Sequence, residues 1–321
     1  MDYRVYETLY KDLAAMTVES EALAAQFLPG SGGKLASLLY KPRGLELLVQ
    51  RPGATYLRQP YDGDYLAGEC SGCDDMFPTI DACFYQTYPW KGTPIPDHGE
   101  VWSLPWDCRV DAGRLHLVAH GVRFPYRLEK WAGTPEPATL QIDYRLTSLS
   151  DFDMDFMWAA HMMVNLEEGA ELVLPPGVRQ VVNRLSFNGR LGRYGDVLDW
   201  PHCTTADGTA HDLSRLRPKS VRDADKYFVK GALPEGWCAL KLPQSHLTLR
   251  LSFPVEQVPY LGVLPNEGGF QDLYNIFLEP CTASFDDLNV AKVRGECSTL
   301  RAHSTREWSL RITVAEDTGT T

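Results

Sequence analysis

Apolar and polar residues alternate with a period of two along much of this chain, and this pattern constrains the fold more than any other feature. In such a stretch, successive side chains point to opposite faces, as in a β-strand with one buried face. The alternation is clearest in residues 140–146, 247–253 and 308–314. The 26 Gly and 22 Pro residues are spread out, as turns between many strands require. The sequence therefore predicts an all-β protein with two packed antiparallel sheets.

The 321 residues are expected to form a single domain spanning residues 1–321, because all-β domains often exceed the usual domain length. Residues 191–223 are polar and irregular, which indicates a long loop or flap rather than a domain boundary. The N-terminal region leaves two alternatives open. Residues 6–25 have some helical periodicity, whereas residues 18–28 fit a strand equally well.

The formal net charge of −11 argues against nucleic acid as a partner, because a phosphate backbone needs a basic face. Charged residues interrupt any apolar core of a secretory signal near the N-terminus, and no stretch approaches the ~18 apolar residues of a membrane span. We therefore expect a cytoplasmic protein with no membrane partner. The eight cysteines are scattered and are expected to be free thiols. Cys70 and Cys73 form a lone CxxC without further ligands at zinc spacing, so no metal and no cofactor are predicted.

Three residues stand in local sequences that suit acid/base chemistry. His98 lies in Asp-His-Gly-Glu, His161 ends the run Trp-Ala-Ala-His, and Glu279 lies in Leu-Glu-Pro-Cys. Two imidazoles and a carboxylate are the usual parts of a metal-free acid/base site. If residues 276–279 form a strand, Pro280 should mark its end or an edge, where a carboxylate is well presented. Continuing the period of two from residue 152 places His161 on the face opposite the neighbouring aromatic residues.

Five short motifs, in order, resemble those of the aldose 1-epimerases (galactose mutarotases). They are Gly32–Leu38 (GGKLASL), His98-Gly99 followed by Trp102, Trp158–His161 (WAAH), Asp225–Val229 (DKYFV), and Leu278–Cys281 (LEPC) continuing through Asp286–Asn289 (DDLN). The resemblance extends from about residue 32 to the C-terminal strand. It implies a β-supersandwich with a sugar site on the concave face of the larger sheet.

The resemblance also implies a reaction and roles for single residues. The activity would be cofactor-independent exchange of sugar anomers by ring opening, with Glu279 as the base and His161 as the acid. His98 would bind the sugar near its ring oxygen, and Asp225 would accept hydrogen bonds from its hydroxyls.

Trp102 and Trp158 are candidates to stack on a pyranose face. From the residues alone, other readings stay open: a solvated strand-end Glu279, a core His161, a turn His98, a solvated charge run around Asp225 and a core Trp158.

The chain departs from the family pattern at two places. Galactose mutarotases carry an Asn-Arg pair before the first histidine, where residues 73–78 read Cys-Asp-Asp-Met-Phe-Pro, so the arginine is missing or comes from elsewhere. Residues 285–287 (Phe-Asp-Asp) replace the family's Pro-Asp.

Two other functions fit the same fold: a non-catalytic carbohydrate-binding protein and a hexose-6-phosphate mutarotase. A phosphosugar enzyme needs clustered basic side chains. Arg179, Arg184, Arg190 and Arg193 are the candidates.

Overall fold

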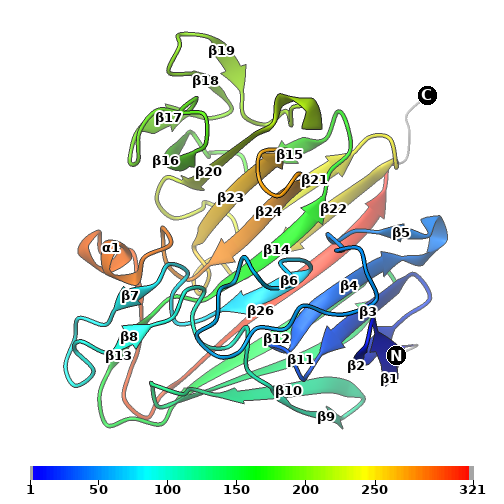
Figure 1. Ribbon diagram of the computed structural model, residues 1–321, viewed down its shortest axis with the longest axis vertical. Helices are drawn as coiled ribbons and strands as arrows, with labels where there is room; N and C mark the ends of the chain where they lie inside the picture. The colour runs from blue at the N-terminus through cyan, green and yellow to red at the C-terminus, as the bar shows by residue number, and fades with distance from the viewer. Residues whose placement is uncertain (1–2, 318–321) are drawn as a thin grey trace.

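Two large antiparallel sheets make up most of the computed structural model, which describes residues 3–317 (Figure 1). The 12-stranded sheet contains, in spatial order, β1 (Arg4–Tyr10), β2 (Leu13–Glu19), β3 (Leu23–Leu28), β4 (Lys34–Tyr40), β6 (Cys73–Met76), β14 (Ala159–Asn165), β24 (Tyr274–Cys281), β23 (Tyr260–Glu267), β20 (Asp223–Val229), β16 (Gln180–Ser186) and β17 (Val197–Asp199), with β5 (Leu45–Glu46) beside β4. The eight-stranded sheet contains β15 (Glu171–Val173), β21 (Trp237–Leu242), β22 (Leu247–Ser252), β26 (Thr305–Glu316), β12 (Thr139–Ser148), β11 (Tyr126–Glu136), β10 (Arg114–His120) and β9 (Asp107–Asp111).

The remaining elements are short. Three two-stranded sheets pair β7 (Cys83–Phe84) with β8 (Pro94–Ile95), β13 (Met154–Phe156) with β25 (Ser298–Leu300), and β18 (His202–Thr204) with β19 (Ala210–Asp212). The helical elements described are α1 (Leu288–Val293) and the 3₁₀ turns η1 (Lys41–Arg43) and η2 (Lys219–Val221). The predicted all-β class with large antiparallel sheets is confirmed.

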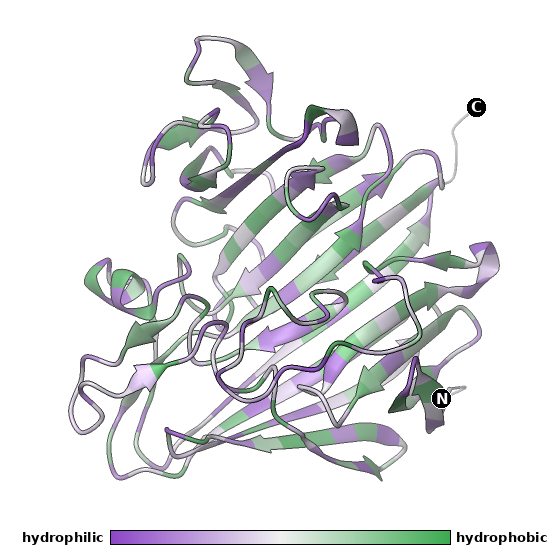
Figure 2. Cartoon of the chain, in the orientation of Figure 1, coloured by the Kyte–Doolittle hydropathy of each residue, from purple (hydrophilic) through white to green (hydrophobic). Residues whose placement is uncertain are grey.

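The three strongest period-two stretches are neighbouring strands of one sheet. They form β12, β22 and β26, and β26 lies between the other two. Their apolar side chains face the core: Leu140, Leu249 and Ile312 are each fully buried. Green, apolar residues cover much of both large sheets in Figure 2, whereas β6 is largely purple because it carries Asp74 and Asp75.

At the N-terminus, strands replace the helical alternative. β1 and β2 form a hairpin that turns at Lys11 and Asp12, and β2 pairs onward with β3. Lys11 adopts the positive φ of 55° that a tight hairpin turn favours. The helical spacing in residues 6–25 is thus overridden by pairing with neighbouring strands, which supply the backbone hydrogen bonds a helix would have made.

Residues 191–223 contribute β17, β18, β19 and η2 at one edge of the 12-stranded sheet. Arg217 holds this segment to the sheet, because its guanidinium lies 2.6 Å from Glu267 Oε2 and 2.9 Å from Asp223 Oδ2. The segment is therefore a long loop region that ion pairs with buried acids attach to the edge of the sheet.

Two local expectations about strands were wrong. β24 does not end before Pro280. It runs on to Cys281 between β14 and β23, so Glu279 lies inside the sheet and not at a strand end. The alternation from residue 152 to His161 does not belong to one strand either, because β13 and β14 lie in different sheets.

Candidate active site

A cavity of about 300 Å³ lies over the middle of the 12-stranded sheet. This volume is at the lower end of the range for small-molecule sites, about 300–1,000 Å³. Strands β14, β16, β20, β23 and β24 supply part of its lining, and the loops that precede β6, β7, β9, β17, β24 and α1 supply the rest. The lining residues are Tyr65, Leu66, Cys70, Ile80, Asp81, Asp97, His98, His161, Arg184, Leu185, Phe187, Lys226, Leu264, Phe270, Phe277 and Asp286.

His161 and Glu279 meet at the floor of this cavity. His161 Nε2 lies 3.4 Å from Glu279 Oε1. The ladder between β14 and β24 is interrupted at this point, between the residue pairs Ala159–Cys281 and Met162–Leu278. Since Pro280 has no N–H to donate, such a gap in the ladder suits its place inside the sheet. His161 lines the cavity, whereas Glu279 is fully buried directly behind it.

Lys226 is the second neighbour of Glu279. Its Nζ lies 2.8 Å from Glu279 Oε2 and 2.9 Å from Asp286 Oδ1. The other oxygen of Asp286 lies 3.0 Å from Arg184 Nε, and Arg184 also pairs with Asp81. Cations and carboxylates thus alternate across the cavity, with each cation between two acids.

Tyr65 holds His161 from the other side. Its hydroxyl lies 3.1 Å from His161 Nδ1 and donates to Asp74 Oδ2 at 3.0 Å. Asp74 in turn pairs with the buried Lys34 at 3.0 Å. These contacts fix the plane of the imidazole and leave Nε2 toward Glu279.

His98 stacks on Tyr65, with ring centroids 3.8 Å apart and an interplanar angle of 12°. Its Nδ1 lies 2.8 Å from Asp97 Oδ2, and among residues 3–317 its Nε2 has no hydrogen-bond partner. The predicted turn is confirmed, because His98 and Gly99 have φ of 60° and 75°. A Cβ on Gly99 would lie 2.1 Å from the carbonyl oxygen of Phe77, so only glycine permits this close approach.

Burial dominates the electrostatics of the site. It lowers the pKa of His161 well below its usual value, and the nearby His98, Lys226 and Lys34 lower it further. Burial also raises the pKa of Glu279, although Lys226 opposes that shift. Burial disfavours the Lys226 ammonium as well, but Asp286 and Glu279 outweigh it and raise its pKa. At neutral pH the site therefore holds a neutral imidazole beside a charged lysine.

Three of the expected sugar contacts do not line the cavity. Asp225 points to the opposite face of β20 from Lys226, where it accepts a hydrogen bond from Ser186 and pairs with Arg190. The DKYFV motif therefore contributes Lys226, and strand alternation explains why its acid cannot.

The two tryptophans, Trp102 and Trp158, pack against other side chains and do not line the cavity. Trp158 is buried beside Tyr144 and donates from Nε1 to Asp75 Oδ1 at 2.9 Å, as its core alternative required. The ring of Trp102 packs edge-on against that of Tyr65, with the ring centroids 5.0 Å apart. Its Nε1 donates to the carbonyl oxygen of Asp97 at 3.1 Å. It supports the ring that holds both histidines.

Most of the lining was not assigned to the site from the sequence, including the polar residues Tyr65, Lys226 and Asp286, and Arg184 was named only as a candidate for phosphate binding. Lys226 stands beside Asp225, the residue expected to act in its motif, and Asp286 stands in a motif element for which no acting residue was predicted. Arg184, from β16, is an arginine that lines the cavity. Tyr65 lies in an irregular loop with no pattern that could have revealed it.

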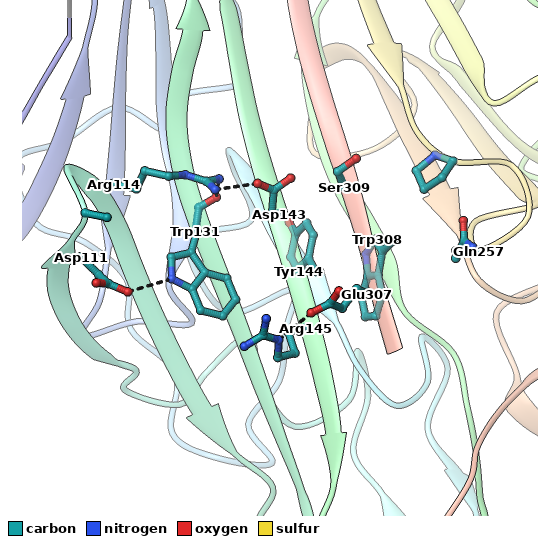
Figure 3. Close-up of a pocket in the computed structure, with 12 residues that line it drawn as sticks. Asp111, Arg114, Trp131, Asp143, Tyr144, Arg145, Gln257, Glu307, Trp308 and Ser309 are labelled. Atoms are coloured by element: carbon teal, nitrogen blue, oxygen red, sulfur yellow. Dashed lines mark hydrogen bonds and ion pairs between the residues drawn. The ribbon is translucent and has the colours of Figure 1, made fainter. Parts of the chain in front are cut away.

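A larger hollow, of about 630 Å³, lies on the eight-stranded sheet (Figure 3). Four of its five charged side chains form ion pairs with each other: Arg114 lies 2.6 Å from Asp143, and Arg145 lies 2.7 Å from Glu307. It is lined by no histidine, so it lacks the acid/base pair of the first cavity.

Within residues 3–317, no cluster of three or more His, Cys, Asp or Glu side chains has an arrangement suited to a metal ion. No helix in the same range is long and apolar enough to cross a membrane.

Comparison with solved structures decides the fold. The Slr1438 protein from Synechocystis sp. PCC 6803 superposes with a TM-score of 0.70 at 17% identity, covering 97% of this chain and 99% of that one. A galactose mutarotase-like protein from Lactobacillus casei gives a TM-score of 0.67 at 17% identity, covering 94% of this chain and 100% of that one. The chain has the galactose mutarotase-like fold.

A second galactose mutarotase-like protein, from Clostridium acetobutylicum, has a TM-score of 0.69 at 12% identity, and the match covers 98% of this chain and 99% of that one. No protein-family model matches the sequence, and comparison with curated proteins gives no match. The galactose mutarotase-like fold is thus supported by structure over nearly the whole chain, at sequence identities that carry no activity with them.

Proposed function

We propose that this protein is an aldose 1-epimerase-like enzyme that interconverts the anomers of a small sugar. The observation that carries the proposal is the His161–Glu279 pair, 3.4 Å apart at the floor of a cavity in a galactose mutarotase-like fold. Anomer exchange needs one group that takes a proton and one that gives a proton, held on either side of the C1–ring oxygen bond.

In the proposed reaction, Glu279 takes the proton of the C1 hydroxyl while the bond between C1 and the ring oxygen breaks. His161 gives a proton to the ring oxygen, and the open aldehyde rotates and recloses on its other face. The raised pKa of Glu279 strengthens the carboxylate as a base. The lowered pKa of His161 makes its protonated form a stronger acid but a scarcer one at neutral pH. His98, whose Nε2 has no hydrogen-bond partner in the described part of the chain, binds near the ring oxygen and can share the acid role.

The second candidate function is sugar binding without catalysis. It is favoured by the full burial of Glu279 and by the Lys226 ammonium 2.8 Å from its carboxylate, because an ion-paired acid is a weaker base. The two candidates differ in one observable, which is whether a bound anomer is converted into the other.

A phosphorylated sugar suits the cavity less well. Its lining contains three acids, Asp81, Asp97 and Asp286, against the two cations Arg184 and Lys226. Both cations already contact carboxylates, so a phosphate would compete with fixed acids for them.

The test is a mutarotation screen with freshly dissolved single anomers of neutral and 6-phosphorylated aldoses, followed by polarimetry. We expect acceleration with neutral sugars and less or none with the phosphorylated ones. Binding without acceleration for every sugar would establish the non-catalytic alternative.

A further inference from the structure

Part of the mouth of the candidate cavity is apolar, beside the acids Asp81 and Asp97, whose side chains are 39% and 43% exposed. Leu66, Leu185 and Phe187 line it and are 48%, 42% and 46% exposed. Phe270 also lines it, with its ring centroid 6.4 Å from that of Phe187. Single exposed apolar residues are common on protein surfaces, but several around one cavity indicate a binding surface. We name these four residues the apolar rim.

The apolar rim is held in place by polar contacts from its own loops. Gln271 Nε2 donates to the carbonyl oxygen of Leu66 at 3.3 Å, which joins two loops far apart in sequence. Asn266 accepts from the backbone N–H of Phe270 at 2.8 Å and donates to its carbonyl oxygen at 2.9 Å. A surface fixed in this way requires little ordering when a ligand binds.

The rim begins directly beside the polar floor. Leu185 on β16 is the register partner of Lys226 on β20, and both line the cavity. The floor offers charged and imidazole groups that suit hydroxyls, whereas the apolar rim offers carbon surface. A sugar with hydroxyls on every carbon could hydrogen-bond to the floor, but some of its hydroxyls would then contact the apolar rim. The cavity thus favours a ligand with one polar end and one apolar end.

We infer that the substrate is a free aldose that carries an apolar alkyl or acyl substituent on a carbon distant from C1, with that substituent resting on the apolar rim. The inference rests on the proposed function, because C1 must lie at the His161–Glu279 floor for the substituent to reach the mouth. C1 itself keeps its hydroxyl, since ring opening requires it.

The test compares D-glucose and D-galactose with their 6-O-hexyl ethers, with affinity measured by isothermal titration calorimetry. Each buried methylene should tighten binding about fourfold. With two or three methylenes on the rim, the ethers should therefore bind at least about tenfold more tightly than the parent sugars. In the double variant Leu185→Ser, Phe187→Ser, the ratio of the two affinities should fall toward one. The control Leu149→Ser alters a side chain that is 50% exposed and outside the cavity lining, and it should keep the wild-type ratio.

The inference is overturned if the ethers bind no more tightly than the parent sugars, if they do not bind, or if the double variant keeps the wild-type ratio. Anomer exchange of the bound sugars is measured separately by NMR. Ethers that bind on the rim without being exchanged would refute the proposed catalysis and leave the preference for an apolar substituent as a property of a binding site, so the two failures are distinguishable.

Discussion

Lys226 Nζ lies 2.8 Å from Glu279 Oε2, and both side chains are almost entirely removed from solvent. A buried carboxylate without a cation beside it would lose much of its tendency to ionise. The ammonium therefore keeps the proposed base charged inside the sheet, at the cost of some of its basicity.

Lys226→Met tests this relationship through stability. The variant leaves Glu279 and Asp286 buried without their shared cation, which should lower the free energy of unfolding at pH 8 by about 3–5 kcal/mol. Chemical denaturation gives the measurement. The matched control is Lys230→Met, since Lys230 is an exposed lysine just past the end of the same strand. Equal stability of both variants would mean that the buried pair contributes nothing.

Tyr65→Phe removes the hydroxyl between His161 and Asp74 and keeps the ring that stacks on His98. It leaves buried polar atoms with one partner fewer, so we expect a loss of about 1–3 kcal/mol in the free energy of unfolding. Anomer exchange should also slow, because the imidazole is no longer held toward Glu279. Tyr88→Phe, at an exposed tyrosine, should change neither quantity. An unaltered exchange rate in Tyr65→Phe would show that the tyrosine does not position His161.

The lowered pKa of His161 predicts how stability depends on pH. The folded state holds the imidazole neutral, so its contribution is full above the unfolded value of about 6.5 and is lost as pH falls through that value toward the folded pKa. Between pH 7 and pH 5 the free energy of unfolding of the wild type should therefore fall more than that of His161→Gln. Because Glu279 contacts His161, the difference between the two proteins reports the His161–Glu279 pair. The exposed His303→Gln should behave as the wild type, and parallel curves for His161→Gln and wild type would contradict the shift.

Much of the fold was predictable because strand alternation is a local signal. The stretches that became β12, β22 and β26 have one buried face each, and their periodicity is visible in the residues themselves. The N-terminal strands were ambiguous, because the pairing that decides between helix and strand lies outside the segment.

The candidate site was predictable only in part, for a related reason. His98, His161 and Glu279 come from distant parts of the chain, and the resemblance to a family supplied their association. Within the DKYFV motif, the residue facing the cavity depends on the register of β20 in the sheet, which assigns Lys226 to one face and Asp225 to the other. Tyr65 reaches His161 from an irregular loop, and no periodicity marks such a contact.

The most direct test of the proposed catalysis is the rate of anomer exchange in Glu279→Gln, measured by NMR on a sugar that the wild type converts. The substitution keeps the shape of the side chain and removes the base. We predict that sugar binding persists while exchange slows by about 10²–10⁴-fold. Exchange at the wild-type rate in this variant would contradict the assignment of Glu279 as the base and, with it, the mechanism proposed for this site.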